Sequence, residues 1–232
     1  MALDLTYILL VLPAVILSLW ASANVKRTYA RYSKQRNARG LTGADAARRV
    51  LDANGLRDIP VERISGELSD HYDPDARVVR LSDAVWGGCS TAAVGVACHE
   101  VGHAIQNAEG YLPVRIRQAI IPATNIGAKL SVPLLMAGLI LCSFSPKLIV
   151  LAYAGVALYS LCALFQLVTL PTEFDASRRA LRSIESMGLL AGEEYQGAKK
   201  VLNAAALTYV AALATTLMQL LRFVMILNNR RR

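Results

Sequence analysis

The chain consists of long apolar blocks separated by polar ones. The apolar blocks cover residues 5–21, 116–144, 148–170 and 204–227, and none of them contains Asp or Glu. A helix that crosses the hydrocarbon core of a bilayer needs about 20 predominantly apolar residues. The pattern therefore predicts a membrane protein with four spanning helices. The lipid bilayer is accordingly one expected partner.

The basic residues predict how these spans are oriented. They gather after the first apolar block, from Lys26 to Arg39, and after the third, at Arg178 and Arg179. Because Lys and Arg favour cytoplasmic loops, both polar segments are expected to face the cytoplasm. A fourth span would then place Arg230–Arg232 outside, against this rule; the alternative is a last helix partly buried against the polar region.

Prolines mark predicted helix boundaries in the second half of the chain. Pro122 and Pro133 interrupt the block 116–144. Pro171 follows the third block at once, and proline fits the first turn of a helix. A new helix is therefore predicted to begin at Pro171, with a break near Gly188.

The polar region predicts a small mixed structure. Thr42 can cap a helix over about 43–53, and Ser90 can cap another over about 91–107. Strands are predicted at 61–64 and 76–82, and a loop at 70–75.

The second of these helices contains the sequence His99-Glu100-Val101-Gly102-His103. Positions i and i+4 lie on one face of a helix, so the two imidazoles can share a Zn²⁺ ion. Glu100 is then placed to take a proton from a water molecule. A solvated face with two histidines is the plainer alternative, which the apolar neighbours in this helix disfavour.

A catalytic zinc usually has three protein ligands. Glu109, His71 and the acids at 172–176 are the candidates for the third, since the metzincin spacing fails. Glu173 is the strongest of them: two predicted spans separate it from His103, and an even number of crossings returns the chain to the same side of the membrane.

Composition excludes other classes of protein. The net charge of +8 could indicate nucleic-acid binding, but the basic residues flank apolar blocks, where anionic lipid explains them. The four cysteines form no C-x-x-C pair and are expected to be free thiols. Ala21-Ser22-Ala23 resembles a signal-peptidase site, yet residues 1–4 carry an acid and no base, which favours an uncleaved anchor.

Four stretches give the chain a family resemblance. They are Asp70–Pro74, Val79–Ser82, His99–Gln106 and Glu173–Ser177. Together they resemble the bacterial membrane zinc metallopeptidases of the YugP type, which are similar to HtpX-type gluzincins. The resemblance implies that His99, His103 and Glu173 are zinc ligands. One departure is Ser177, because HtpX-type proteins commonly carry there an Asp that orients a zinc histidine.

The expected fold is mainly α: several membrane-spanning helices with a small cytoplasmic, gluzincin-like zinc-protease domain that carries a short β-sheet. The predicted divisions are an N-terminal anchor at 1–23, a zinc-motif region at 24–113, two spans at 114–170, a cytoplasmic helix with the third ligand at 171–203, and an apolar helix with a basic tail at 204–232.

The expected function is a multi-pass zinc endopeptidase of the cell membrane, cleaving membrane or cytoplasmic proteins. Glu100 would be the general base, His71 a donor to the oxyanion, and the strand 77–82 a binding edge for an extended substrate. The alternatives are a membrane scaffold with a structural zinc and an intramembrane protease of the site-2 type.

Overall fold

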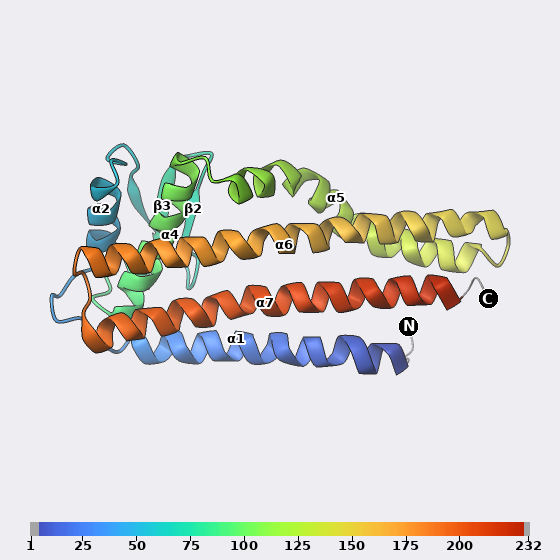
Figure 1. The fold of residues 1–232 in the computed structure, drawn as a ribbon, viewed down its shortest axis with the longest axis horizontal. Coiled ribbons are helices and arrows are strands. Elements are labelled where there is room, and N and C mark those ends of the chain that lie inside the picture. Colours follow the sequence, from blue (N-terminus) through green and yellow to red (C-terminus); the bar gives the residue numbers. More distant parts are fainter. Residues whose placement is uncertain (1–4, 230–232) are drawn as a thin grey trace. The chain divides into compact units, whose positions relative to one another are not determined.

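The computed structural model describes residues 5–229 and is mainly helical, with one small sheet (Figure 1). The elements in chain order are the π-helix η1 (Tyr7–Val11), α1 (Leu12–Tyr32), α2 (Gly43–Ala53), β1 (Val61–Ile64), β2 (His71–Asp73), β3 (Val78–Ser82), α3 (Asp83–Trp86), α4 (Thr91–Ala108), α5 (Leu112–Leu141), the 3₁₀ turn η2 (Pro146–Leu148), α6 (Ile149–Ser186) and α7 (Gly192–Asn229). The acidic start at residues 1–4 and the basic tail at 230–232, whose charges bear on the predicted membrane orientation, lie outside the described residues.

Four helical segments are long and apolar enough to cross a membrane. They are Tyr7–Tyr32, Leu112–Leu141, Pro146–Ser186 and Gly192–Asn229. Each overlaps one of the four apolar blocks, so the expected number of candidate spans is confirmed for the described residues. α4, which carries the His-Glu-x-x-His sequence, is not one of them.

The chain forms two compact units. The apolar unit comprises Met1–Trp20, Arg115–Leu170 and Tyr209–Arg232, and the polar unit comprises Ala21–Val114 and Pro171–Thr208. In the apolar unit, glycines let α5 and α6 pack backbone to backbone. A Cβ atom at Gly138 would lie 2.2 Å from the Ala152 nitrogen, and one at Gly155 would lie 2.5 Å from the Ser131 carbonyl oxygen.

Three prolines lie inside helices. α5 runs through Pro122 and Pro133, and Figure 1 shows it changing direction along its length. α6 runs through Pro171, so the predicted helix start at this residue is wrong. Proline removes one backbone hydrogen bond, but the two residues that follow it, Thr172 and Glu173, are buried, and this packing keeps the helix continuous.

The polar unit holds a three-stranded sheet in the order β1-β3-β2. β1 pairs parallel with β3, and β2 pairs antiparallel with it. The prediction of a loop at 70–75 is wrong for His71–Asp73, which form β2. Three residues flanked by turn-forming aspartates carry no strand period, so only pairing with β3 makes them a strand.

β3 begins at Val78, two residues later than predicted, because Arg77 has a positive φ of 53°. β3 also lies in the middle of the sheet and is paired on both sides. It therefore has no open edge, and the prediction that the strand 77–82 binds an extended substrate is wrong. The outer strand beside the histidine helix is β2.

The two predicted capped helices of this unit are confirmed. Thr42 forms a capping box with Asp45 at the start of α2, and the Ser90 side chain accepts a hydrogen bond from the Ala93 N–H at the start of α4. α4 packs against α2 and the sheet. It also meets α7 closely, because a Cβ atom at Gly95 would lie 3.2 Å from that of Ala198.

Candidate metal centre

α4 presents both motif histidines on the same face. The ring centroids of His99 and His103 are 4.8 Å apart, and the two rings meet edge to face. Their side chains are 14% and 16% exposed. The rings are therefore largely buried but still reachable from outside, which a site for an exchanging ligand requires.

Glu173 meets these rings from α6. Its Oε2 lies 3.3 Å from His99 Nε2 and 3.6 Å from His103 Nε2. The residue is 3% exposed. One ligand atom from each of the three residues lies within 4.8 Å of the other two. The structure thus brings together the three residues that sequence reasoning named as ligands.

A glycine allows α6 to come this close to α4. A Cβ atom at Gly102 would lie 2.6 Å from the Ala176 carbonyl oxygen, closer than van der Waals contact permits. Glycine allows such an approach because it has no side chain. Gly102 lies inside the pentapeptide, and Ala176 lies three residues after Glu173. The helix crossing is therefore located where the ligand must be positioned.

The donor set and its spacing fit zinc. Zinc bonds of about 2.0–2.2 Å at tetrahedral angles separate neighbouring ligand atoms by about 3.3–3.6 Å. The two Nε2–Oε2 distances, 3.3 and 3.6 Å, lie in this range. Two imidazoles and one carboxylate are also the ligands of one common catalytic zinc type, which keeps a fourth position open.

A hydrogen-bonded relay holds His103. Its Nδ1 lies 3.0 Å from Gln106 Oε1, and Gln106 Nε2 donates to the Thr172 carbonyl oxygen at 2.8 Å and to Asp175 at 3.0 Å. With both amide hydrogens on acceptors, Gln106 must turn its oxygen to the ring. His103 therefore donates from Nδ1, and its Nε2 keeps a lone pair for a metal.

The far end of this relay is anchored by charge. Arg179 Nε donates to Asp175 at 2.6 Å, and its NH1 donates to Glu109 at 2.7 Å. Arg179 thus fixes the Asp175 carboxylate, which in turn fixes Gln106. His99 has simpler support, since its Nδ1 lies 3.2 Å from Ser177 Oγ.

The electrostatics of the centre favour a positive charge. Burial lowers the pKa of His103, but the hydrogen bond to Glu173 and the charge of Glu100 outweigh it, so the pKa of His103 lies above its usual value. A proton on the ring and a divalent cation are stabilised by the same carboxylates. Cys98, next to His99, is fully buried, which raises the pKa of its thiol to about 12 and keeps it from acting as a thiolate ligand.

Glu100 is tied to the sheet. Its Oε2 accepts a hydrogen bond of 3.0 Å from the Tyr72 backbone N–H on β2. The residue is 8% exposed. This contact orients the carboxylate and leaves Oε1 to exchange a proton. It also sets the outer strand directly beside the carboxylate.

Two other candidates stand apart from this group. His71 Nδ1 lies 2.8 Å from the Ser69 carbonyl oxygen, and Glu109 is bound to Arg179. Neither belongs to the cluster of potential ligands found among the described residues. His71 nevertheless adjoins Tyr72 on β2 and so lies next to the residue that contacts Glu100.

Sequence reasoning missed Gln106 and Tyr72. Gln106 lies three residues after His103 on an apolar helix, and it is completely buried. A polar amide at helical spacing from a ligand is a readable signal for a supporting partner. Tyr72 gives no such signal, because its backbone N–H makes the contact and any residue except proline supplies one.

Comparisons with known proteins extend beyond this centre. A family model described as "Putative neutral zinc metallopeptidase" matches residues 7–228. The chain is 48% identical over 225 residues to a protein of Bacillus subtilis (strain 168) named "Putative membrane protease YugP", covering 97% of this chain and 98% of that protein. No solved structure matches the chain significantly. The likeness therefore spans the candidate spans as well as the pentapeptide.

Proposed function

Because the chain belongs to this family of neutral zinc metallopeptidases, we propose that it is a multi-pass membrane zinc endopeptidase that hydrolyses peptide bonds of membrane or cytoplasmic proteins. The observation that carries the proposal is the convergence of His99, His103 and Glu173 beside Glu100. Each of these side chains has a distinct part in the proposed reaction.

His99, His103 and Glu173 would hold the metal through Nε2, Nε2 and Oε2. When bound, zinc supplies Lewis acidity that activates water and polarises a carbonyl group. Gln106 keeps His103 in the tautomer that offers Nε2, and the Ser177 hydroxyl does the same for His99 when it accepts from Nδ1. The carboxylate of Glu173 adds a negative charge that a divalent cation compensates.

Glu100 is the proposed general base. With Oε2 held by the Tyr72 N–H, its Oε1 takes a proton from the attacking water and passes it to the leaving amine. His71 is the proposed oxyanion donor. Because its Nδ1 contacts the Ser69 carbonyl oxygen, its Nε2 donates only when the ring is protonated.

An extended substrate is proposed to lie along β2. This strand is at the edge of the sheet and contributes the Tyr72 N–H that orients Glu100. Addition of a strand to a sheet edge supplies backbone hydrogen bonds that do not depend on side-chain identity. Because the Tyr72 N–H already donates to Glu100, the substrate would pair with other backbone groups of this edge. β2 thus takes the part that sequence reasoning assigned to residues 77–82.

We place the site on the cytoplasmic side, in a gluzincin-like domain. The basic residues of the polar unit near the ends of the apolar blocks support this orientation. The divisions at 1–23, 24–113, 114–170, 171–203 and 204–232 remain part of the proposal. An intramembrane protease of the site-2 type is disfavoured, because α4 is not a candidate span.

Glu100→Gln tests the reaction against the scaffold alternative. A structural zinc needs no base, whereas proteolysis does. The variant should bind about one zinc per chain, like the wild type, and lose hydrolysis of a quenched fluorescent casein by about 10²-fold or more. Glu185→Gln, an exposed acid on α6, is the matched control and should keep both. Unchanged hydrolysis by Glu100→Gln would refute the proposed peptidase reaction.

A further inference from the structure

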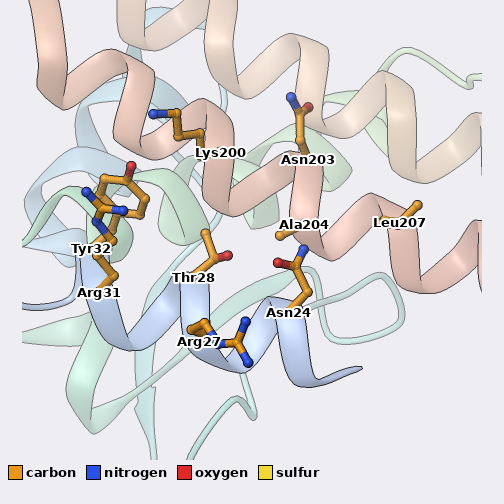
Figure 2. A pocket seen from close by; sticks show the side chains of 9 residues that line it. All are labelled: Asn24, Arg27, Thr28, Arg31, Tyr32, Lys200, Asn203, Ala204 and Leu207. Carbon is orange, nitrogen blue, oxygen red and sulfur yellow. The ribbon is translucent and has the colours of Figure 1, made fainter. Parts of the chain in front are cut away.

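A cavity of about 470 Å³ lies in the polar unit between α1 and α7 (Figure 2). The residues that line it are Asn24, Arg27, Thr28, Arg31 and Tyr32 from α1, and Lys200, Asn203, Ala204 and Leu207 from α7. None of them belongs to the metal centre. The cavity is a second feature of the unit, with its own chemistry.

The lining is cationic and contains no acid. Arg27, Arg31 and Lys200 contribute three positive charges, and within residues 5–229 none of the three forms an ion pair. Arg31 only stacks over the Tyr32 ring, at 5.6 Å from its centroid. Arg31 and Lys200 also line a neighbouring pocket that contains Glu193, but neither forms an ion pair with it. Three cations around one cavity, none of them held in an ion pair, attract an anion. Asn24 and other neutral side chains add hydrogen-bonding groups.

The two ends of the cavity differ in polarity. Figure 2 shows Arg31, Tyr32 and Lys200 at one end and Leu207 at the other. On α7, Ala204 begins the last apolar block. The cavity is therefore charged at one end and apolar where α7 becomes suited to lipid.

The same transition occurs on α1. Its apolar block ends at Ala21, one turn before the first lining residues, and a rise of 1.5 Å per residue places Arg27 about 9 Å further along the helix. Trp20, which is 54% exposed, precedes Asn24 by one turn. Tryptophan favours the interface between membrane and water. If the apolar block 5–21 crosses the bilayer, the cations lie at the depth of phospholipid headgroups.

We propose that this cavity binds the phosphate headgroup of an anionic phospholipid, with an acyl chain leaving past Leu207. A free phosphate would satisfy the three cations, but it would make no use of the apolar end. A lipid matches both ends at once. The site would couple the polar unit to the composition of the leaflet that it faces.

Native mass spectrometry of the full-length, delipidated protein tests the proposal. The probes are dioleoylphosphatidylglycerol, dioleoylphosphatidylcholine and inorganic phosphate. Arg27→Gln/Arg31→Gln/Lys200→Gln should weaken phosphatidylglycerol binding by about tenfold or more, since each cation near an anionic lipid contributes roughly fivefold. Lys200→Gln alone should give about a fivefold loss, and it serves if the triple variant fails to fold.

The matched control is Lys26→Gln/Lys34→Gln/Lys199→Gln. It removes the same charge from exposed positions near the cavity that do not line it. Because these exposed lysines do not line the cavity, the proposal expects this control to bind phosphatidylglycerol within about twofold of the wild type. An equal loss in both triple variants, or equal binding of phosphatidylcholine, would show diffuse attraction and overturn the site. Inorganic phosphate binding as tightly as phosphatidylglycerol would overturn the lipid assignment.

Discussion

The candidate metal centre has two sides that are built differently. Its helical side, on α4 and α6, is buried: Glu173 is 3% exposed and Gln106 is fully enclosed. Its strand side consists of His71–Asp73 on β2, and all three residues are half-buried. The helical side is held by close helix packing at Gly102, whereas the strand side depends on hydrogen bonds near the surface.

This difference matches two kinds of ligand. A metal ion needs donor atoms fixed to a few tenths of an ångström, which buried helices and a saturated relay provide. A peptide brings its own backbone hydrogen bonds, so an outer strand needs only an open edge. Two hydrogen bonds join the sides at Tyr72: its backbone N–H donates to Glu100, and its hydroxyl accepts from Asn107 Nδ2 at 3.2 Å. The comparison predicts that changes to the ligands and their supporting partners on the helical side alter metal binding, and that changes on the strand side alter turnover.

The largest effect is expected from Glu173→Gln. This variant keeps the shape of the side chain and removes the charge that holds the metal. Zinc affinity should fall by more than the roughly 10–100-fold that loss of a supporting partner causes, and activity should vanish at ordinary zinc concentrations. Titration with zinc, read by mass spectrometry of the bound metal, measures it beside the Glu185→Gln control. Wild-type affinity in Glu173→Gln would remove this residue from the ligand set.

The same two sides differ in what the sequence reveals. His99 and His103 follow from helical periodicity, because positions i and i+4 always share a face. Glu173 is 70 residues further on, and the family resemblance and the count of membrane crossings, not any local pattern, made it a candidate. That count uses the apolar blocks alone, so it predicts the side of the membrane on which Glu173 lies but gives no distance. The 3.3 Å approach depends on Gly102 and Ala176, whose packing no local pattern indicates.

The strand side was not predictable in the same way. β2 has three residues, too few to show alternation, and its pairing with β3 is a tertiary contact. The prediction that a helix begins at Pro171 was wrong for a related reason. A proline at the end of an apolar block resembles a helix start, but the burial of Thr172 and Glu173 keeps α6 unbroken. Local sequence rules correctly predicted the capped helices α2 and α4. They failed for β2 and for the continuous helix α6, because tertiary packing determines these two elements.

On the strand side, His71→Ala tests the proposed oxyanion donor. It should lower kcat by about 10²-fold, the usual cost of removing such a donor, with little change in zinc affinity. His71→Gln offers an amide N–H and should recover part of the loss. Steady-state kinetics on the fluorescent casein, with zinc content measured in parallel, separates these effects. A loss of zinc in His71→Ala would instead assign the residue to the metal.

The two imidazoles of the helical side should respond unequally to loss of their supports. Gln106→Leu cuts the relay from His103 to Asp175 and leaves a buried Nδ1–H without an acceptor, so zinc affinity should fall by about 10–100-fold. Ser177→Ala removes one contact of 3.2 Å from His99 and should cost less. Competition with a fluorescent zinc chelator measures the zinc affinity of each variant and ranks the two losses. Equal losses would mean that the relay adds nothing beyond a single hydrogen bond.

The smallest effect is expected at Asp73, which shapes the turn after β2. Hydrogen bonds from the Ala76 N–H and Arg80 hold the pKa of Asp73 below its usual value, so their stabilisation is present above about pH 4 and is lost as pH falls through the lowered pKa. Asp73→Asn should lower the Tm by about 1–3 °C at pH 6. That difference should shrink as the pH falls below about 4 and the wild-type carboxylate becomes protonated. The control is Asp75→Asn, because the Asp75 carboxylate accepts neither bond, and this variant should show no such trend. A Tm difference for Asp73→Asn that stays constant across this pH range would mean that Asp73 stabilises the strand side by its shape and not by its charge.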